Sequence, residues 1–134
     1  MKNLLLICEE PTEIEFCKKI LYDHFKNYKI NLSYILILHS NGGIVPWEIL
    51  KKQIEKHFND DKEITISTFI DYYGIYSHHK FPNWDLAEIE PNKTSRMRIL
   101  QDGMKNDIDD KIKFIPYILL HEFEALAFSA YDIF

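Results

Sequence analysis

Hydrophobic and polar residues follow one another along this chain as short apolar runs separated by longer amphipathic stretches. The apolar runs cover residues 4–8, 32–38, 64–70 and 114–120. Runs of this length, rich in aliphatic and β-branched residues, are typical of strands that are buried on both faces of a parallel sheet. The pattern therefore predicts four strands.

Helical spacing fills the stretches between these strands. Apolar residues recur every three or four positions over residues 12–28, 46–58 and 94–108, and a further helix is expected to begin at His121. Alternating strands and helices predict an α/β fold in which a parallel sheet carries helices on both faces. A length of 134 residues suits a single domain over residues 1–134.

Acidic residues follow the first and third strands. Glu9 and Glu10 end the first apolar run, and Asp71 directly follows the third. Thr12 is expected to cap the helix after the first strand, with Glu15 as its partner in a capping box. The first strand, an acidic turn and a helix therefore follow one another without a long loop.

The carboxyl ends of strands are where open α/β sheets bind ligands, and this places Glu9, Glu13 and Asp71 where chemistry is expected. Two carboxylates about 5 Å apart repel by roughly 3 kcal/mol at an effective dielectric constant of about 20, and a divalent cation removes that cost. Oxygen ligands suit Mg²⁺ or Mn²⁺. The alternative is that each acid acts locally, with Glu13 at the positive end of the helix and Asp71 capping the next loop.

The overall charge restricts the kind of partner. A formal net charge of −5 argues against a broad basic surface, so a nucleic-acid substrate would need metal ions, a local basic patch or a partner protein. Cys8 and Cys17 do not form a CxxC motif, and we expect buried thiols in a reducing cytoplasm. Because the first apolar run stops at Glu9, it predicts a strand, and neither a signal peptide nor a membrane anchor.

Residues 72–92 form a long irregular segment that is rich in aromatic residues. A loop of this length inside a compact domain is usually functional or disordered, and the aromatic content favours function. Aromatic side chains can stack on bases, and the basic side chains of this segment and the next helix, Lys93 included, can bind phosphates. The alternative is a solvated surface with a few packed aromatic rings. The expected substrate contacts are Tyr73, His79, Lys80 and Arg96.

Three segments resemble known families. The turn Glu9-Glu10-Pro11-Thr12-Glu13 is similar to the EGxxE turn of Toprim domains of the OLD-nuclease kind. Residues 68–74 (TFIDYYG) and 114–126 (FIPYILLHEFEAL) resemble a Toprim-related bacterial family, catalogued as domain of unknown function 4276. The resemblance covers nearly the whole chain, and its most specific segments are DYYG and HEFEAL.

The resemblance implies a three-layer α/β/α, Toprim-like (Rossmann-like) fold with a four-stranded, mostly parallel sheet in the order 2-1-3-4. It also implies a Mg²⁺ or Mn²⁺ cofactor and the cutting or joining of phosphodiester backbones. Glu9 matches the glutamate after the first strand, Glu13 the second acid of the turn, and Asp71 the first aspartate of a DxD motif. The chain is short for the family, which implies that a C-terminal segment is missing.

Two positions depart from the Toprim pattern. Glu10 replaces the glycine of EG, and a side chain must be tolerated there if that glycine needed a positive φ. Tyr73 stands where the second aspartate of DxD would be. Glu122 or Glu124, after the fourth strand, is expected to supply the missing carboxylate. The expected site therefore has Glu9, Glu13 and Asp71 as catalytic residues and Glu9, Asp71, Glu122 and Glu124 as metal ligands.

Together these inferences predict a Mg²⁺-dependent, Toprim-like phosphodiesterase or nuclease that acts on DNA or RNA in bacterial defence or nucleic-acid processing. A rival hypothesis is a non-catalytic module that keeps the fold and docks on an ATPase partner. A third is a receiver-like domain that accepts a phosphoryl group at Asp71. The sequence leaves the oligomeric state open, a homo-oligomer included.

Overall fold

The computed structural model describes residues 2–38 and 43–120, in which strands and helices alternate. The strands are β1 (Lys2–Cys8), β2 (Ile30–Leu36), β3 (Thr65–Asp71), β4 (Lys113–Ile115) and β5 (Ile118–Leu119). The α-helices are α1 (Pro11–Phe16), α2 (Tyr22–Lys26), α3 (Trp47–Asp60), α4 (Trp84–Glu88) and α5 (Lys93–Asp107). A π-helical turn, η1 (Cys17–Leu21), joins α1 to α2, and two 3₁₀ turns, η2 (Tyr72–Gly74) and η3 (Ser77–His79), follow β3.

The strands form one parallel sheet in the order β2-β1-β3-β4, with β5 also paired to β3. This arrangement confirms the predicted α/β class and the predicted strand order. In the register of the central strands, Cys8 lies between Leu36 of β2 and Phe69 of β3. The residue after Cys8 is therefore at the carboxyl edge of the sheet, beside the end of β3.

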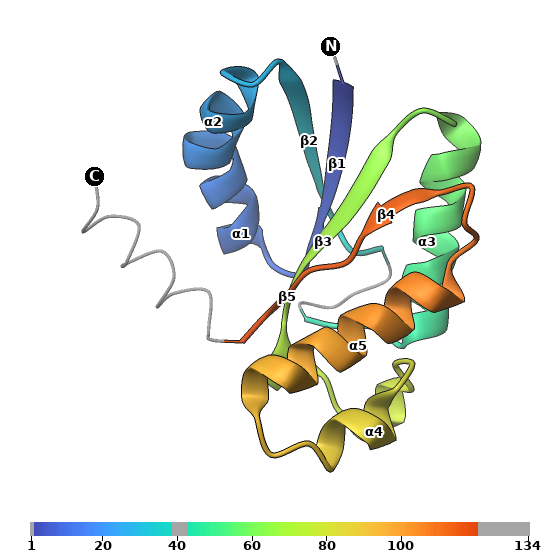
Figure 1. The fold of residues 1–134 in the computed structure, drawn as a ribbon. Coiled ribbons are helices and arrows are strands. Elements are labelled where there is room, and N and C mark those ends of the chain that lie inside the picture. Colours follow the sequence, from blue (N-terminus) through green and yellow to red (C-terminus); the bar gives the residue numbers. More distant parts are fainter. Residues whose placement is uncertain (1, 39–42, 121–134) are drawn as a thin grey trace.

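Helices cover both faces of the sheet, which makes the three-layer arrangement visible in Figure 1. On one face, α1 and α2 pack over Leu6, Cys8 and Phe69. On the other face, α3 and α5 enclose the larger core, which includes Ile7, Ile66 and Phe114. Side chains that alternate along each strand reach opposite layers, which is why the strands read as continuous apolar runs.

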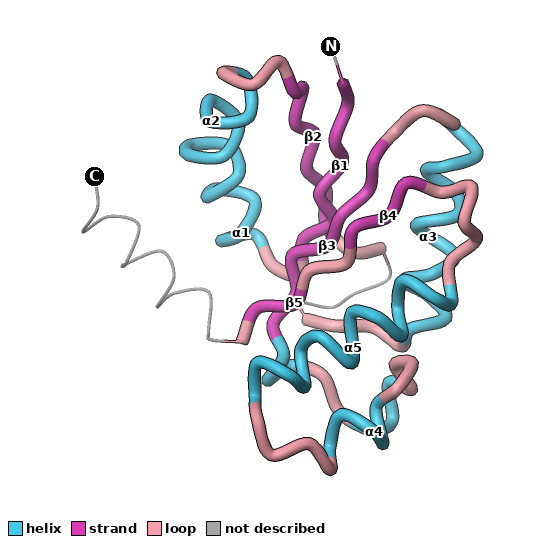
Figure 2. The backbone as a smooth tube through the Cα atoms, viewed as in Figure 1, coloured by secondary structure: helices cyan, strands magenta, loops and turns pink. Residues whose placement is uncertain are grey.

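The first predicted helix is a single helical run, which Figure 2 shows as one continuous coil. It covers residues 11–26, and its middle, Cys17–Leu21, is π-helical. It begins two residues earlier than expected, because Glu10 is the N-cap and Pro11 takes the first helical position, where its fixed φ is favourable. The capping partner is therefore Glu13, and the expectation of Thr12 and Glu15 is wrong. At the π turn, the N–H of Tyr22 donates to the carbonyl of Cys17.

The fourth predicted strand is divided into β4 and β5 by Pro116 and Tyr117. Pro116 has no N–H to donate to a ladder. The buried Thr68 hydroxyl of β3 bridges the gap, since it donates to the carbonyl of Tyr117 at 2.9 Å and accepts from the N–H of Tyr117 at 2.9 Å. A side chain thus satisfies both backbone groups of Tyr117 where the ladder is interrupted.

The long segment after β3 carries more structure than the sequence pattern indicated. It contains η2, η3 and the short helix α4, which Figure 1 shows beyond the carboxyl end of β3, near the start of α5. Within residues 2–38 and 43–120, no helix is both long enough and apolar enough to cross a bilayer. The helix predicted from His121 lies outside the described residues.

Candidate functional site at the ends of β1 and β3

Glu9 joins the ends of the two central strands. Its N–H donates to the carbonyl of Phe69 at 3.3 Å, which continues the β1–β3 ladder by one residue. Its side-chain Oε2 accepts a hydrogen bond from the N–H of Asp71 at 3.1 Å. With only 6% of its surface exposed, Glu9 is a buried carboxylate directed at the end of β3.

Gly74 leaves the space that the Glu9 carboxylate fills. A Cβ atom built on Gly74 would lie 2.7 Å from Glu9 Oε1, closer than such an atom is found to any neighbour. Hence the last residue of the Asp-Tyr-Tyr-Gly segment is a glycine because of Glu9, 65 positions earlier in the chain.

Asp71 ends β3 and starts the turn that contains Gly74. Its Oδ1 accepts a hydrogen bond from the N–H of Tyr73 at 3.1 Å, which caps the 3₁₀ turn η2. Its side chain is partly exposed, in contrast to that of Glu9. The structure therefore brings Glu9 and Asp71 together, one carboxylate buried and the other open to solvent.

Glu13 holds the acidic turn in place from the first turn of α1. Its Oε2 accepts from the N–H of Glu9 at 2.7 Å and from the N–H of Glu10 at 2.9 Å, and the residue is 2% exposed. Glu10 has φ −135° and ψ 158°, which is ordinary extended backbone. The turn needs no positive φ at this position, so Glu10 can stand in place of a glycine.

Burial shifts the proton affinity of both inner glutamates. Loss of solvation is the main cause that raises the pKa of Glu9 from 4.5 to about 7; the hydrogen bond from Asp71 N–H opposes it, and the charges of Asp71 and Glu10 add to it. Loss of solvation likewise raises the pKa of Glu13 to about 8, with a smaller contribution from the charge of Glu9. Both carboxyls therefore titrate near neutral pH.

The donor set suits a hard divalent cation. Mg²⁺ is usually bound by one or two carboxylates together with water and substrate phosphates, and Glu9 and Asp71 can supply two. Glu13 is engaged with the backbone of the turn. Among residues 2–38 and 43–120, no group of three or more His, Cys, Asp or Glu residues is arranged to hold a metal ion. The expected ligands Glu122 and Glu124 lie outside the described residues.

A cluster of tyrosine and basic side chains borders the site on the side of Asp71. Lys93, the first residue of α5, donates from Nζ to the hydroxyl of Tyr73 at 3.2 Å, and its Nζ lies 5.8 Å from the centre of the Tyr73 ring. Arg96 donates from Nε to the carbonyl of Glu90 and from a terminal nitrogen to the hydroxyl of Tyr72 at 3.4 Å. Arg96 is therefore engaged in tying the start of α5 to the preceding loop.

The two remaining residues expected to contact substrate lie in η3 and directly after it. His79 is buried, and its Nδ1 accepts from the N–H of Tyr76 at 2.8 Å; burial and the neighbouring His78 lower its pKa. Lys80 is exposed and has a left-handed backbone at φ 56°, which ends the turn. His79 is thus a structural element of this turn.

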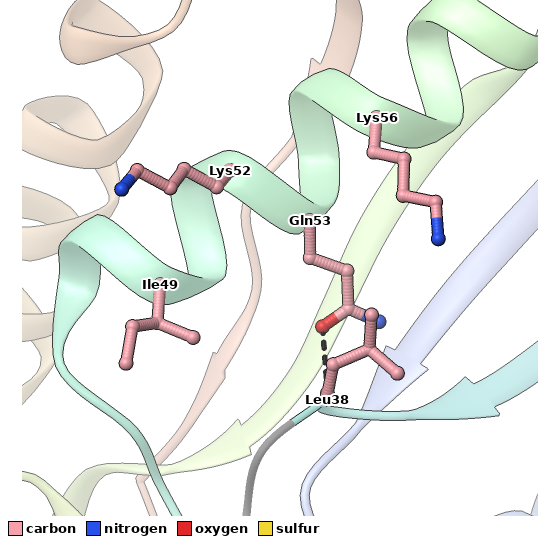
Figure 3. A pocket seen from close by; sticks show the side chains of 5 residues that line it. All are labelled: Leu38, Ile49, Lys52, Gln53 and Lys56. Carbon is pink, nitrogen blue, oxygen red and sulfur yellow. Dashed lines mark hydrogen bonds between the residues drawn. The ribbon is translucent and has the colours of Figure 1, made fainter.

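A shallow pocket of about 380 Å³ lies at the end of β2 against α3 (Figure 3). Its lining includes Lys52 and Lys56, whose heads point away from one another in Figure 3, and the amide of Gln53. Gln53 is buried and spans the chain after β2, accepting from the N–H of Leu38 at 2.9 Å and donating to the carbonyl of Leu36 at 3.2 Å. None of these described lining residues carries a carboxylate, and the pocket lies on the β2 side of the sheet.

Sequence reasoning did not assign roles to Gly74 or Gln53. A signal for Gly74 was present, since it ends the DYYG segment, but its reason is a contact with a residue of another strand. Gln53 occupies a buried position on α3, where a polar residue among Leu50 and Ile54 is unexpected. Such a residue needs hydrogen-bond partners, and the backbone of β2 supplies them.

Comparison with known protein families matches residues 8–134 to the family described as Domain of unknown function (DUF4276). No curated protein matches the chain, and no solved structure matches it. The match covers Glu9, Glu13, Gly74 and every strand except β1, of which it includes only Cys8. The chain therefore belongs to the DUF4276 family.

Proposed function

We propose that this protein is a Toprim-like, Mg²⁺- or Mn²⁺-dependent phosphodiesterase that acts on nucleic acid. The observation that carries the proposal is the hydrogen bond from the N–H of Asp71 to Glu9 Oε2, which brings the acid after β1 to the acid after β3. These are the two positions at which the Toprim resemblance implies metal ligands. Under this proposal, Glu9 and Asp71 hold the cation and Glu13 holds Glu9.

Each acid has a distinct part in this proposal. Glu9 is buried, and the N–H of Asp71 holds its Oε2. The other carboxylate oxygen, Oε1, therefore keeps its orientation while ligands exchange. Asp71 is partly exposed and can meet both a cation and a substrate phosphate. Glu13 keeps the Glu9–Glu10 turn rigid through two N–H groups. A bound divalent cation would supply charge neutralisation at the phosphate and a more acidic water.

The raised pKa of Glu9, about 7, allows this carboxyl to give up its proton when a cation binds. The buried environment also strengthens its interaction with positive charge, because little water screens it. Both effects favour a site that is neutralised by protons without metal and by a cation when metal is present.

The proposal is tested with purified protein, labelled DNA and RNA, and Mn²⁺ or Mg²⁺. We expect cleavage that requires the cation and falls at least 100-fold in both Glu9→Gln and Asp71→Asn. Titration calorimetry with Mn²⁺ alone should show binding that the same variants weaken. Glu15→Gln is the matched control, since Glu15 is an exposed acid of α1 that pairs with Lys19 at the surface. Cleavage by Glu9→Gln at the unaltered rate would refute the assignment.

A second candidate is a Toprim-fold module without catalysis that docks on an ATPase partner. Two observations favour it. Tyr73 occupies the position of the second aspartate. The described residues contain no group of three or more His, Cys, Asp or Glu side chains that could hold a metal ion. Under this alternative, Mn²⁺ titration gives no heat that Asp71→Asn removes, and no nucleic acid is cut.

A further inference from the structure

Tyr73 and Lys93 form a fixed basic arm beside the proposed site. Tyr73 follows Asp71 by two residues, and its N–H donates to Asp71 Oδ1 at 3.1 Å. Its hydroxyl accepts from Lys93 Nζ at 3.2 Å. A Toprim motif would have a second carboxylate at position 73. Here that position has a tyrosine, whose hydroxyl binds the ammonium group of Lys93.

The tyrosine is supported from the interior. Its ring packs edge-on against Tyr72, with ring centres 5.2 Å apart and an angle of 68° between them. Tyr72 is buried, and its hydroxyl donates to Glu88 at 3.0 Å. Tyr73 itself is 47% exposed. Tyr73 is thus packed on a buried residue on one side and open to a ligand on the other.

The charge of Lys93 is not compensated within the part of the chain that the structure describes. No carboxylate of residues 2–38 or 43–120 lies within ion-pair distance of its Nζ, and the first turn of α5 contains no acidic residue. A neutral phenol accepts a hydrogen bond but leaves the positive charge available. The ammonium therefore suits an anion that approaches beside the turn formed by Asp71 and Tyr73.

We infer that Lys93, held by Tyr73, binds a backbone phosphate of the substrate next to the one at the carboxylates. This inference rests on the proposed function and selects one among the basic residues near the site. Arg96 is occupied by Glu90 and Tyr72, whereas Lys93 has only the Tyr73 hydroxyl as a hydrogen-bond partner among the described residues. Lys93 is thus a positioning residue, with no part in bond breaking.

The test measures binding separately from cleavage. Fluorescence anisotropy with fluorescein-labelled single-stranded and duplex oligonucleotides, in Ca²⁺, gives the dissociation constant as a function of salt. We expect Lys93→Met to weaken binding about tenfold. The slope of log K against log salt should also become shallower, by about the amount that one lost phosphate contact gives. Lys93→Arg should retain most of the affinity. In cleavage assays, Lys93→Met should raise KM about tenfold with kcat within about twofold.

Two further variants make the result specific. Lys62 precedes the amino end of β3, whereas Asp71 lies at the carboxyl end of the same strand. Lys62→Met therefore removes the same charge far from the proposed site and should leave binding and its salt dependence unchanged. Tyr73→Phe should weaken binding about threefold in the original protein and have no further effect in Lys93→Met, because the hydroxyl acts through the ammonium.

The outcomes separate this inference from the proposed function. If the protein binds or cuts nucleic acid and Lys93→Met behaves as the original protein, or loses no more than Lys62→Met, the inference is wrong and the proposed function stands. If the original protein neither binds nor cuts any of these oligonucleotides, both fail.

Discussion

Gly74 and the Glu9 carboxylate occupy adjoining space, so that a Cβ atom on Gly74 would lie 2.7 Å from Glu9 Oε1. The contact joins the turn after β3 to the turn after β1. Two residues far apart in the chain therefore constrain each other at the proposed metal site.

Gly74→Ala should displace the Glu9 carboxylate without unfolding the protein. The new methyl group meets the end of a side chain, which can rotate, and Gly74 has no positive φ that alanine would resist. We expect Mn²⁺ affinity, measured by calorimetry, to fall at least tenfold and the free energy of unfolding to fall by about 1 kcal/mol.

Gly43→Ala is the matched control for this prediction. Gly43 has φ +125°, so alanine is strained there, but nothing lies within 4 Å of the added Cβ. It should reduce stability without altering Mn²⁺ affinity. Equal metal affinity in Gly74→Ala and the original protein would mean that the Glu9 position is not set by this contact.

Glu13→Ala should loosen the acidic turn and destabilise the fold. The change leaves the N–H of Glu10 without its acceptor and the N–H of Glu9 with only its longer bond to the Phe69 carbonyl, a loss of about 1–3 kcal/mol. Glu13→Gln keeps an acceptor of the same shape and should cost less. Urea unfolding measures both, and Glu15→Ala, an exposed change on the same helix, should cost under about 0.5 kcal/mol. A cost of Glu13→Ala as small as that control would show that the turn does not depend on Glu13.

Without divalent ions, stability should fall as pH rises from about 6.5 to 8.5. The folded pKa values of Glu9 and Glu13 are raised to about 7 and about 8, so the folded protein holds protons that the unfolded chain has already lost. Their contribution is fully present below pH 4.5 and is lost as pH passes through 7 and 8. His57 and His79, whose pKa values are lowered, act in the opposite direction only near and below pH 6.5.

Urea unfolding at several pH values measures this dependence, which we expect to be on the order of 1 kcal/mol per pH unit near pH 7. The Glu9→Gln, Glu13→Gln double variant should have a nearly flat profile over the same range. Stability that rises between pH 6.5 and 8.5 in the original protein would contradict the assignment.

Gln53→Leu should destabilise the end of β2. It removes the hydrogen bonds to Leu36 and Leu38 and leaves two partly buried backbone groups unpaired, at a cost of about 1–3 kcal/mol. Hydrogen exchange at the Leu38 amide should speed up more than exchange within β1. Lys52→Ala, an exposed neighbour on α3 in the same pocket, should have little effect on either measurement.

The positions of the strands and the placement of Glu9 and Asp71 follow from the sequence because both depend on short-range patterns, whereas the strand order was expected from the Toprim resemblance. A buried parallel strand reads as an apolar run, and the residue after it must lie at the carboxyl edge. The start of α1 was placed two residues late because a threonine is a good cap in general, whereas here Pro11 decides where the helix begins.

Other features depend on contacts between distant segments, and no local pattern shows them. The need for Gly74 comes from Glu9, and the hydrogen bonds of Gln53 come from β2. The two hydrogen bonds between Thr68 and Tyr117, beside Pro116, also require the neighbouring strand to be in register. The pairing of Tyr73 with Lys93 likewise needs α5 to start beside the turn after β3.

The Gln53 amide also changes what the sheet offers along its β2 side. Within the described residues, β2 is the outer strand on that side, and such a strand offers unpaired N–H and C=O groups to any extended chain. Gln53 occupies the N–H of Leu38 and the carbonyl of Leu36, and on the opposite side β4 is only three residues long and is followed by Pro116. Fewer backbone groups are therefore open to edge-to-edge strand pairing at the carboxyl end of β2 and along β4.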